Sequence, residues 1–387
     1  MAHVLSHGVH ELLSSPNALR DQRISKRLIL SYIVDWVVIL FTAALGRIIK
    51  IVEPNRNPFS LKDQSISYPF AVNETISVTV LIIVSLVVPA VVIAALSLLF
   101  TPHSSDRKSL SKTGVWRRKI WEWNVGWMGL GVSYAATWTA TEGLKLVFGK
   151  PRPDLLSRCN PDLSDISRHI VGGLGEVLEG APSLVAWTIC QNKSDRLSRD
   201  GFVSFPSGHA SMSFAGLAYL SLWLAAKLCV AFPYLPRRWF ARPVHQDYLL
   251  NPARLSDADG DNQSGDDGNS SFRRLQPIRN QGAAPPTYLL FLVMIPICAA
   301  TYIASSRWVD NRHYGFDILF GSLLGTTFAW IGFRLYNPPL NSGAVSAWGC
   351  RTWDHAFSFR HEVVPDTTAK GGLAATEDAL PQTRSSI

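Results

Sequence analysis

Long apolar stretches alternate with polar segments along this chain. The stretch Ile76–Phe100 contains no charged residue, and about 20 helical residues are enough to cross the hydrocarbon core of a bilayer. Five more stretches have a similar apolar character: Leu28–Gly46, Trp123–Leu144, Ala210–Phe232, Tyr288–Ala304 and Phe316–Phe333. We therefore predict an all-α integral membrane protein with six transmembrane helices.

Two features of these stretches leave room for another interpretation. Tyr288–Ala304 is the shortest of them, and Lys227 interrupts Ala210–Phe232. Any single stretch of this kind could instead be a buried helix of a soluble protein, and 387 residues would also fit two soluble domains. Six apolar stretches in succession favour the membrane protein.

Basic residues next to the apolar stretches predict how the helices are oriented. Cytosolic flanks of membrane helices carry an excess of Lys and Arg. Such residues precede the first helix, lie between the second and third, and follow the fourth: Arg20, Arg23, Lys26, Arg27, Arg107, Lys108, Lys112, Arg117, Arg118, Lys119, Arg237, Arg238 and Arg242. We expect both termini in the cytosol, although the loop after the third helix also carries several basic residues.

The same pattern divides the chain into three parts. Residues 1–27 are predicted to form a cytosolic segment without a cleavable signal peptide, so that the first helix acts as an anchor. Residues 28–336 form the membrane domain, and residues 337–387, which lose the apolar periodicity, form a cytosolic tail. Within the membrane domain, the residues from about 251 to 280 are rich in Asp, Gly, Ser and Asn, which predicts a disordered cytosolic loop.

Three polar motifs stand at the ends of the predicted helices. Lys145 and Arg152-Pro153 close the third helix, and Pro206–His209, with the sequence Pro-Ser-Gly-His, opens the fourth. The third motif lies between the fifth and sixth helices and contains Ser306-Arg307, His313 and Asp317. Alternation of six helices places all three motifs on one side of the membrane, and the basic flanks make this the lumenal or extracellular side.

The cations of these motifs are suited to binding phosphate. A phosphoryl group in transfer spreads negative charge over its oxygens, and fixed positive groups stabilise that charge. Lys145, Arg152 and Arg307 lie at helix ends, where they can stay charged. Each alone could simply anchor its helix at the lipid headgroups. That alternative does not explain why they accompany the other two motifs.

The start of the fourth helix offers a second set of phosphate ligands. A helix amino end presents free N–H groups and a positive dipole end, and Gly208 lets a ligand approach the backbone. Ser207 either caps the helix or donates its hydroxyl to a phosphate oxygen, and the residue type does not separate these roles. We expect His209, with an ordinary pKa of about 6.5, to protonate a departing oxygen.

The third motif supplies a candidate nucleophile. His313 and Asp317 are four residues apart, so on a helix they share one face. Asp317 would then accept a hydrogen bond from one imidazole nitrogen and leave the other as an oriented nucleophile. A structural His–Asp pair, in which the histidine neutralises a carboxylate at the head of an apolar helix, is the alternative.

Together these motifs carry a family resemblance. Lys-x6-Arg-Pro, Pro-Ser-Gly-His and Ser-Arg-x5-His-x3-Asp resemble the three signatures of the type 2 phosphatidic acid phosphatase superfamily. The resemblance extends from about Leu28 to Phe333, and the chain looks like the fungal and plant lipid phosphate phosphatases, similar to diacylglycerol pyrophosphate phosphatase. The acidic loop near residue 260 and the large loop Ser157–Asp200 look less typical.

The resemblance implies a role for each matching residue. His313 would form a phosphohistidine, Asp317 would orient it, and His209 would act as the acid and then activate water. The implied phosphate-binding residues are Lys145, Arg152, Ser207, Gly208 and Arg307. The resemblance also implies that no metal or other cofactor is needed, and the motifs contain no carboxylate cluster or Cys/His pair of the kind that binds metals.

The expected substrate is phosphatidic acid, diacylglycerol pyrophosphate or lysophosphatidic acid, so the partners are a phosphorylated lipid and the bilayer, and not nucleic acid. The net charge of +8 fits anionic membrane surfaces. Phosphatases of polyprenyl diphosphates or of soluble phosphoesters have the same motifs, and a binding or transport protein would need only the cations. Vanadate haloperoxidases share the anion pocket, but six apolar stretches argue against a soluble enzyme. Vacuole, Golgi, endoplasmic reticulum and plasma membrane are not distinguished, nor is the oligomeric state.

The predicted lumenal loops contain possible modification sites. Cys159 and Cys190 share the large loop, where an oxidising compartment would permit a disulfide without requiring one. Asn73 and Asn192 begin sequons for N-glycosylation, and Asn73 lies close to the start of the second helix.

Overall fold

The computed structural model describes residues 26–99, 112–228, 230 and 286–337. The predicted amino-terminal segment before residue 26, the acidic loop at about 251–280 and the tail from residue 338 lie outside the described residues. Val34–Cys350 forms one compact unit, which holds all the site residues discussed below. The other unit comprises Met1–Ile33 and Arg351–Ile387, and its described part is the beginning of the first long helix.

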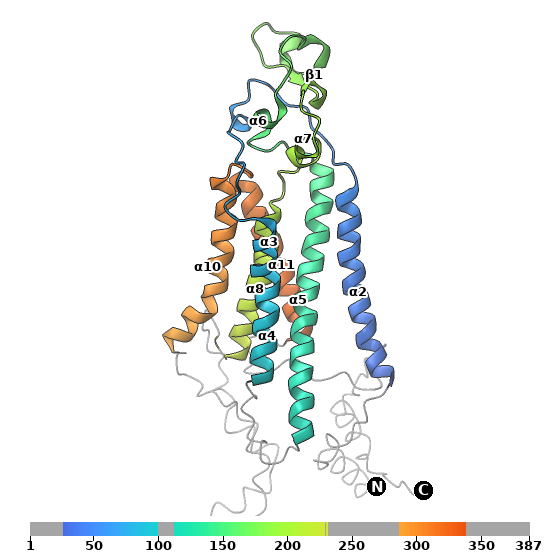
Figure 1. The fold of residues 1–387 in the computed structure, drawn as a ribbon, viewed down its shortest axis with the longest axis vertical. Coiled ribbons are helices and arrows are strands. Elements are labelled where there is room, and N and C mark those ends of the chain that lie inside the picture. The colour runs from blue at the N-terminus through green and yellow to red at the C-terminus, as the bar shows by residue number, and fades with distance from the viewer. Residues whose placement is uncertain (1–25, 100–111, 229, 231–285, 338–387) are drawn as a thin grey trace, which may run out of the picture. The chain divides into compact units, whose positions relative to one another are not determined.

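Long helices make up most of the described chain (Figure 1). The helices are α2 (Lys26–Ile51), α3 (Val78–Ile82), α4 (Val88–Leu99), α5 (Lys112–Phe148), α6 (Leu155–Cys159), α7 (Asp195–Ser198), α8 (Gly208–Lys227), α10 (Thr287–Val309) and α11 (Gly315–Tyr336). A π-helical turn, Ile83–Val87, joins α3 to α4. Short 3-10 helices occur at Gln64–Ile66, Ser167–His169, Leu174–Glu176, Trp187–Ile189 and Asp200–Phe202.

Four helical segments among the described residues are long and apolar enough to cross a membrane: Ile29–Ile51, Val78–Leu99, Thr287–Val309 and Gly315–Tyr336. Large apolar side chains on them are exposed, for example Phe41 and Leu319 at 68% each, as expected for side chains that face lipid. The chain is therefore a mostly helical, multi-pass membrane protein. The other two predicted spans lie on α5 and α8, and the number of six transmembrane helices stays a prediction.

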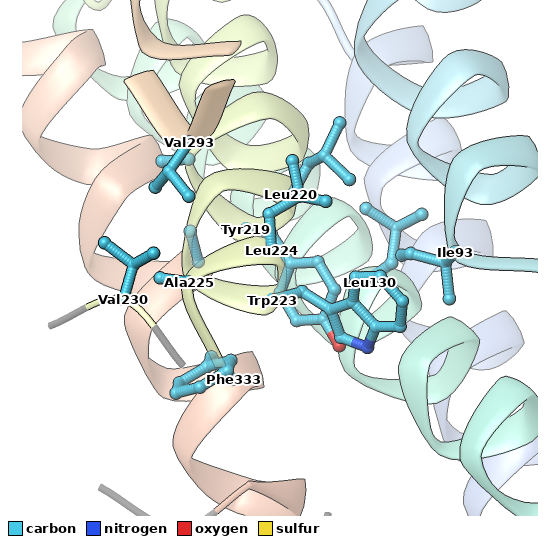
Figure 2. Packing of buried hydrophobic residues seen from close by; sticks show 12 residues of the cluster. Ile93, Leu130, Tyr219, Leu220, Trp223, Leu224, Ala225, Val230, Val293 and Phe333 are labelled. Atoms are coloured by element: carbon cyan, nitrogen blue, oxygen red, sulfur yellow. The ribbon is translucent and has the colours of Figure 1, made fainter. Parts of the chain in front are cut away.

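α8 is less apolar than these four because protein surrounds it. It packs against α5, α10 and α11, and most of its side chains are buried. Figure 2 shows Tyr219, Leu220, Trp223 and Leu224 of α8 at the centre of the largest apolar cluster, with Val293 of α10 and Phe333 of α11 packed around them. Burial against other helices permits serines and glycines at positions where exposure to lipid would favour Leu, Ile or Val.

Glycines let α11 approach α8 closely at the site end of the helices. A Cβ atom at Gly321 would lie 2.6 Å from the carbonyl oxygen of Ser207, and one at Gly325 would collide with the carbonyl oxygen of Ser211. The two glycines are four residues apart and so lie on one helix face. The start of α11 is thereby held against the start of α8, which brings the second and third motifs together.

The segment between α5 and α8 folds as a small layer beyond one end of the long helices (Figure 1). It contains a hairpin of β1 (Ile170–Gly172) and β2 (Leu184–Val185), with Ile170 paired to Val185. A disulfide joins Cys159 to Cys190. The sequence permits this bridge without requiring it, and the structure contains it. Leu155, Leu197 and Phe202 pack around this bridge in a buried apolar cluster. The layer ends at the residues that precede α8 and so fixes one wall of the site.

Candidate active site

The three motifs converge on one cavity of about 490 Å³ at the ends of α5, α8 and α10. Its lining includes six of the eight predicted site residues, namely Lys145, Arg152, Gly208, His209, Arg307 and His313. The other two, Ser207 and Asp317, are fully buried and lie behind the lining. Segments that are more than 150 residues apart in the sequence therefore form one site, as the motif positions predict.

The imidazole of His313 is held through both of its nitrogens. Nδ1 lies 2.6 Å from the carbonyl oxygen of Ser204, which can only accept a hydrogen bond, so the proton is on Nδ1. The other nitrogen, Nε2, carries the lone pair and lies 3.0 Å from Nη1 of Arg152. Burial and the Arg152 guanidinium lower the pKa of His313 well below its ordinary value. The ring is therefore neutral, and its Nε2 lone pair accepts a hydrogen bond from Arg152, a cation that could hold a phosphate.

Asp317 does not accept the hydrogen bond that the sequence predicts from His313. Its Oδ2 accepts from the hydroxyl of Ser204 at 2.6 Å, and its Oδ1 lies 2.8 Å from Nζ of Lys150. The predicted contact assumed that both residues lie on one helix, but α11 begins at Gly315, after His313. Asp317 thus sits in the first helical turn, where it also accepts from the N–H of Tyr314, and it reaches the imidazole only through Ser204.

Arg152 is fixed by the loop layer. Its Nε donates to the carbonyl oxygen of Asp200, and its Nη2 lies 2.8 Å from Oδ1 of the same residue. Desolvation in the site would raise the pKa of Asp200, but Arg152 and Arg158 beside it lower that pKa to about 2. The aspartate is therefore ionised at any physiological pH and keeps the guanidinium aligned with His313.

Lys145 lies against the start of α8. Its Nζ is 2.9 Å from Oε1 of Glu142, and it would be 3.0 Å from a Cβ atom at position 208. A side chain at position 208 would therefore shift the end of the lysine side chain by a few tenths of an ångström. Residues of the first and second motifs thus lie next to each other at this point.

The residues next to Gly208 are held by backbone groups. Ser207 is the N-cap of α8: its hydroxyl accepts from the N–H of Ala210 at 3.5 Å, and its own N–H donates to the carbonyl of Asp317. The capping alternative is thus what the structure contains, and a phosphate contact of Ser207 stays a prediction. His209 lines the cavity, with Nε2 3.1 Å from the carbonyl oxygen of Ile76.

Arg307 is almost completely buried, at 1% exposure, in the last turn of α10. Its Nη1 lies 2.9 Å from Oε2 of Glu74, and its Nη2 lies 2.7 Å from Oδ2 of Asp310 and donates to the carbonyl of Ile76. Glu74 also pairs with Arg312. Two carboxylates therefore hold this guanidinium at the cavity.

Sequence reasoning missed five residues that build the site: Glu74, Lys150, Asp200, Ser204 and Arg312. Lys150 and Arg312 lie inside the first and third motifs, at positions that the motif patterns leave open. Ser204 acts partly through its backbone carbonyl, which no residue type reveals. Glu74 and Asp200 come from loops, and the only signal for them is a charge close to an apolar helix or motif.

Within the described ranges, no three or more His, Cys, Asp or Glu side chains lie close enough together to hold a metal ion. The metal independence implied by the family resemblance stays a prediction.

A cavity in which a neutral, oriented histidine faces arginine and lysine side chains is the arrangement expected for phosphoryl transfer. The sequence profile of the PAP2 superfamily matches residues 126–339, which include all three motifs, and the chain belongs to this superfamily.

Several curated proteins are similar to the chain over most of its length. The probable diacylglycerol pyrophosphate phosphatase 1 of Schizosaccharomyces pombe is 30% identical over 288 residues, which cover 74% of this chain and 75% of that protein. Diacylglycerol pyrophosphate phosphatase 1 of Saccharomyces cerevisiae is 26% identical over 75% of this chain and 74% of its own. Lipid phosphate phosphatase 1 of Arabidopsis thaliana is 23% identical over 91% and 81%, respectively. No solved structure matches the chain.

Proposed function

We propose that this protein is an integral membrane phosphatase that hydrolyses phosphorylated lipids, with phosphatidic acid, diacylglycerol pyrophosphate and lysophosphatidic acid as the candidate substrates. The observation that carries the proposal is the placement of His313. Its Nε2 lone pair faces Arg152 at 3.0 Å in a cavity that Lys145, Arg307 and His209 also line. The names of the relatives from both yeasts and from Arabidopsis support a lipid substrate.

The first chemical step is attack of Nε2 of His313 on the phosphorus atom. The bond between phosphorus and the leaving oxygen breaks, and His209 donates a proton to that oxygen, which leaves as an alcohol or, from a diphosphate, as a phosphate. Lys145, Arg152 and Arg307 stabilise the charge on the equatorial oxygens. Ser207 and Gly208 contribute the amino end of α8 as a further anion-binding element.

The second step releases phosphate from the phosphohistidine. His209, now neutral, accepts a proton from a water molecule that attacks phosphorus, and the bond to Nε2 breaks. Both histidines return to their starting states, and inorganic phosphate leaves. The proton stays on Nδ1 of His313 throughout, in its hydrogen bond to the Ser204 carbonyl, so the same nitrogen, Nε2, attacks and leaves.

The placement of the site also belongs to the proposal. With α5 and α8 counted as spans, six transmembrane helices put the cavity on the side opposite both termini, which the basic flanks assign to the lumenal or extracellular face. A lipid could then reach the cavity by lateral diffusion, with its phosphate at headgroup level and its acyl chains in the bilayer. This geometry favours lipids over soluble phosphoesters.

The test is phosphate release from the three lipids by purified protein in detergent micelles with excess EDTA. We expect release by the wild type and a loss of at least about a thousandfold in His313→Ala, because the covalent route disappears. His169→Ala is the matched control, since that histidine is not part of the cavity lining and its side chain bonds to Thr188 in the loop layer.

Either of two results would contradict the proposal. Activity that survives in His313→Ala places the nucleophile elsewhere. A folded wild type that releases phosphate from none of the lipids would leave polyprenyl diphosphates, soluble phosphoesters or a binding role, which the same assay can separate by changing the substrate.

A further inference from the structure

The cations proposed to bind phosphate are already paired with carboxylates when no substrate is present. Lys145 pairs with Glu142, Arg152 with Asp200, and Arg307 with both Glu74 and Asp310. A phosphate that enters the cavity must share these cations with the carboxylates or replace one of them. The question is which carboxylate can leave.

Glu74 differs from the other carboxylates in how it is held. One of its oxygens lies 2.9 Å from Nη1 of Arg307, and the other pairs with Nη2 of Arg312. Within the described part of the chain, these two guanidinium groups are its hydrogen-bond partners. The carboxylate is therefore bound only by cationic groups that line the cavity.

The other carboxylates are tied to groups outside this exchange. Asp310 accepts from the N–H and the hydroxyl of Thr75, in addition to its pairing with Arg307. Asp200 is 2.7 Å from Arg158, which is not part of the cavity lining, and its contact with Arg312 is longer, at 3.4 Å. Glu142 lies one turn before Lys145 on the same helix. Displacing Asp310 or Asp200 would break these further contacts, and the Glu142 side chain, at 12% exposure against 24% for Glu74, has less solvent to turn into.

The backbone that follows Glu74 is anchored, so its side chain can move without shifting α3. Thr75 is bound to Asp310, and Ser77 caps α3 by accepting from the N–H of Val80. The Glu74 side chain is 24% exposed, against 6% for Asp310, and so has solvent to turn into. Glu74 also comes from a segment upstream of residues 126–339, which the superfamily profile matches.

We propose that Glu74 is an internal competitor for the substrate: its carboxylate occupies the anion position between Arg307 and Arg312, and the phosphate of the headgroup displaces it. The inference rests on the proposed function, because it assumes that Arg307 binds phosphate. Carboxylate and phosphate both present two oxygens to paired guanidinium groups, so one can take the place of the other. Glu74 is thus a determinant of affinity for headgroup and product phosphate alike.

Glu74 also stabilises the site when no phosphate is bound. Without Glu74, Arg307 would keep its pair with Asp310, and Arg312 would keep only its longer contacts with Asp154 and Asp200, at 3.5 and 3.4 Å. Two largely buried guanidinium groups would then lose part of their counter-charge, which destabilises a folded protein. Glu74 supplies the counter-charge until phosphate arrives, and it returns when phosphate leaves. Competition of this kind weakens product binding and so favours release of inorganic phosphate.

The experiment compares Glu74→Gln with the wild type and with Glu53→Gln, which removes the same charge from a pair with Arg56 whose carboxylate is 68% exposed. We measure KM for phosphatidic acid, the inhibition constant of inorganic phosphate, and Tm with and without inorganic phosphate. In Glu74→Gln, KM and the inhibition constant should both fall by about fivefold. Its Tm should be lower than that of the wild type without phosphate and should rise more when phosphate is added. Glu53→Gln should behave like the wild type.

Other outcomes overturn the inference. A KM and inhibition constant that rise or stay unchanged in Glu74→Gln would make Glu74 a positioning residue for Arg307. If Glu74→Gln does not fold, Glu74→Ala is tested in the same way, and failure of both to fold would show that the carboxylate is structural. The Tm measurement needs no turnover, so a wild type that hydrolyses no lipid would refute the proposed function while the competitor is still judged by phosphate binding.

Discussion

The carbonyl oxygen of Ser204 lies 2.6 Å from Nδ1 of His313, while the hydroxyl of the same serine lies 2.6 Å from Oδ2 of Asp317. One buried residue therefore stands between the proposed nucleophile and the carboxylate of its motif. The orientation of the imidazole depends on the position of a backbone group, and Asp317 acts by holding that group in place.

Replacing Ser204 with Ala should lower kcat by about ten- to a hundredfold. The substitution keeps the carbonyl but leaves Oδ2 of the fully buried Asp317 without its hydroxyl donor, at a cost of about 1–3 kcal/mol in stability. Steady-state kinetics and thermal unfolding check both effects. Ser164→Ala removes an equivalent bond to Asp162 in an exposed loop and should change neither. An unchanged kcat in Ser204→Ala would mean that the carbonyl alone orients His313.

Lys150 should matter although the motif pattern leaves its position open. Its Nζ lies 2.8 Å from Oδ1 of Asp317 and 4.1 Å from the centre of the Tyr314 ring. Lys150→Met would leave a buried carboxylate without its counter-charge, and because the lysine is partly exposed we expect a loss of only about 1–2 kcal/mol in stability. We also expect a fall in kcat larger than any change in KM. Lys193→Met, which alters an exposed lysine beside the Trp187 ring, is the control for chemical denaturation and kinetics.

The acid limb of the pH profile should report His313. Burial and Arg152 lower its pKa, so the nucleophile stays neutral well below the ordinary value of about 6.5. Phosphoenzyme formation should therefore persist at pH 6 and fall only at lower pH, as the ring becomes protonated. In Arg152→Gln, one cause of the shift is gone, and the acid limb should move to higher pH along with the overall loss of rate.

Trapping of phosphoenzyme in single turnovers across pH 4–8 measures this limb without interference from product release. Arg168→Gln changes an exposed arginine of the loop layer and should leave the limb where it is in the wild type. If the acid limb stays at the same pH in Arg152→Gln, the charge of Arg152 does not lower the pKa of His313, and burial alone is the cause.

Opening the Cys159–Cys190 bridge should reduce both stability and activity. The bridge closes a loop across 31 residues of sequence and lies in the same apolar cluster as Leu155 and Phe202. A disulfide of this kind contributes about 2–4 kcal/mol. The double change Cys159→Ser/Cys190→Ser should lower Tm and loosen Asp200, and with it Arg152, so that kcat falls. Cys298→Ser, at an exposed position, should have no such effect in thermal unfolding or lipid hydrolysis.

The sequence predicts the convergence of the motifs because helix alternation alone brings Lys145, His209 and His313 to one end of the bundle. Four of the predicted spans meet the requirements for a membrane helix by themselves. The pairing of His313 with Asp317 was wrong because it depended on where α11 begins, and a shift of two residues in a helix boundary changes which groups face each other. Glu74 was missed because its role depends on a contact across 233 residues of sequence.

The close approach of α11 to α8 has a consequence for how such chains are recognised. The distance between the proposed nucleophile and the phosphate-binding helix start is set at Gly321 and Gly325, which lie outside all three signatures. A larger residue at either glycine would move the start of α11, with His313, away from the start of α8. The sequence would still contain every signature residue. Among homologues, intact motifs are therefore an incomplete criterion for activity, and the spacing glycines on the last helix should be read together with them.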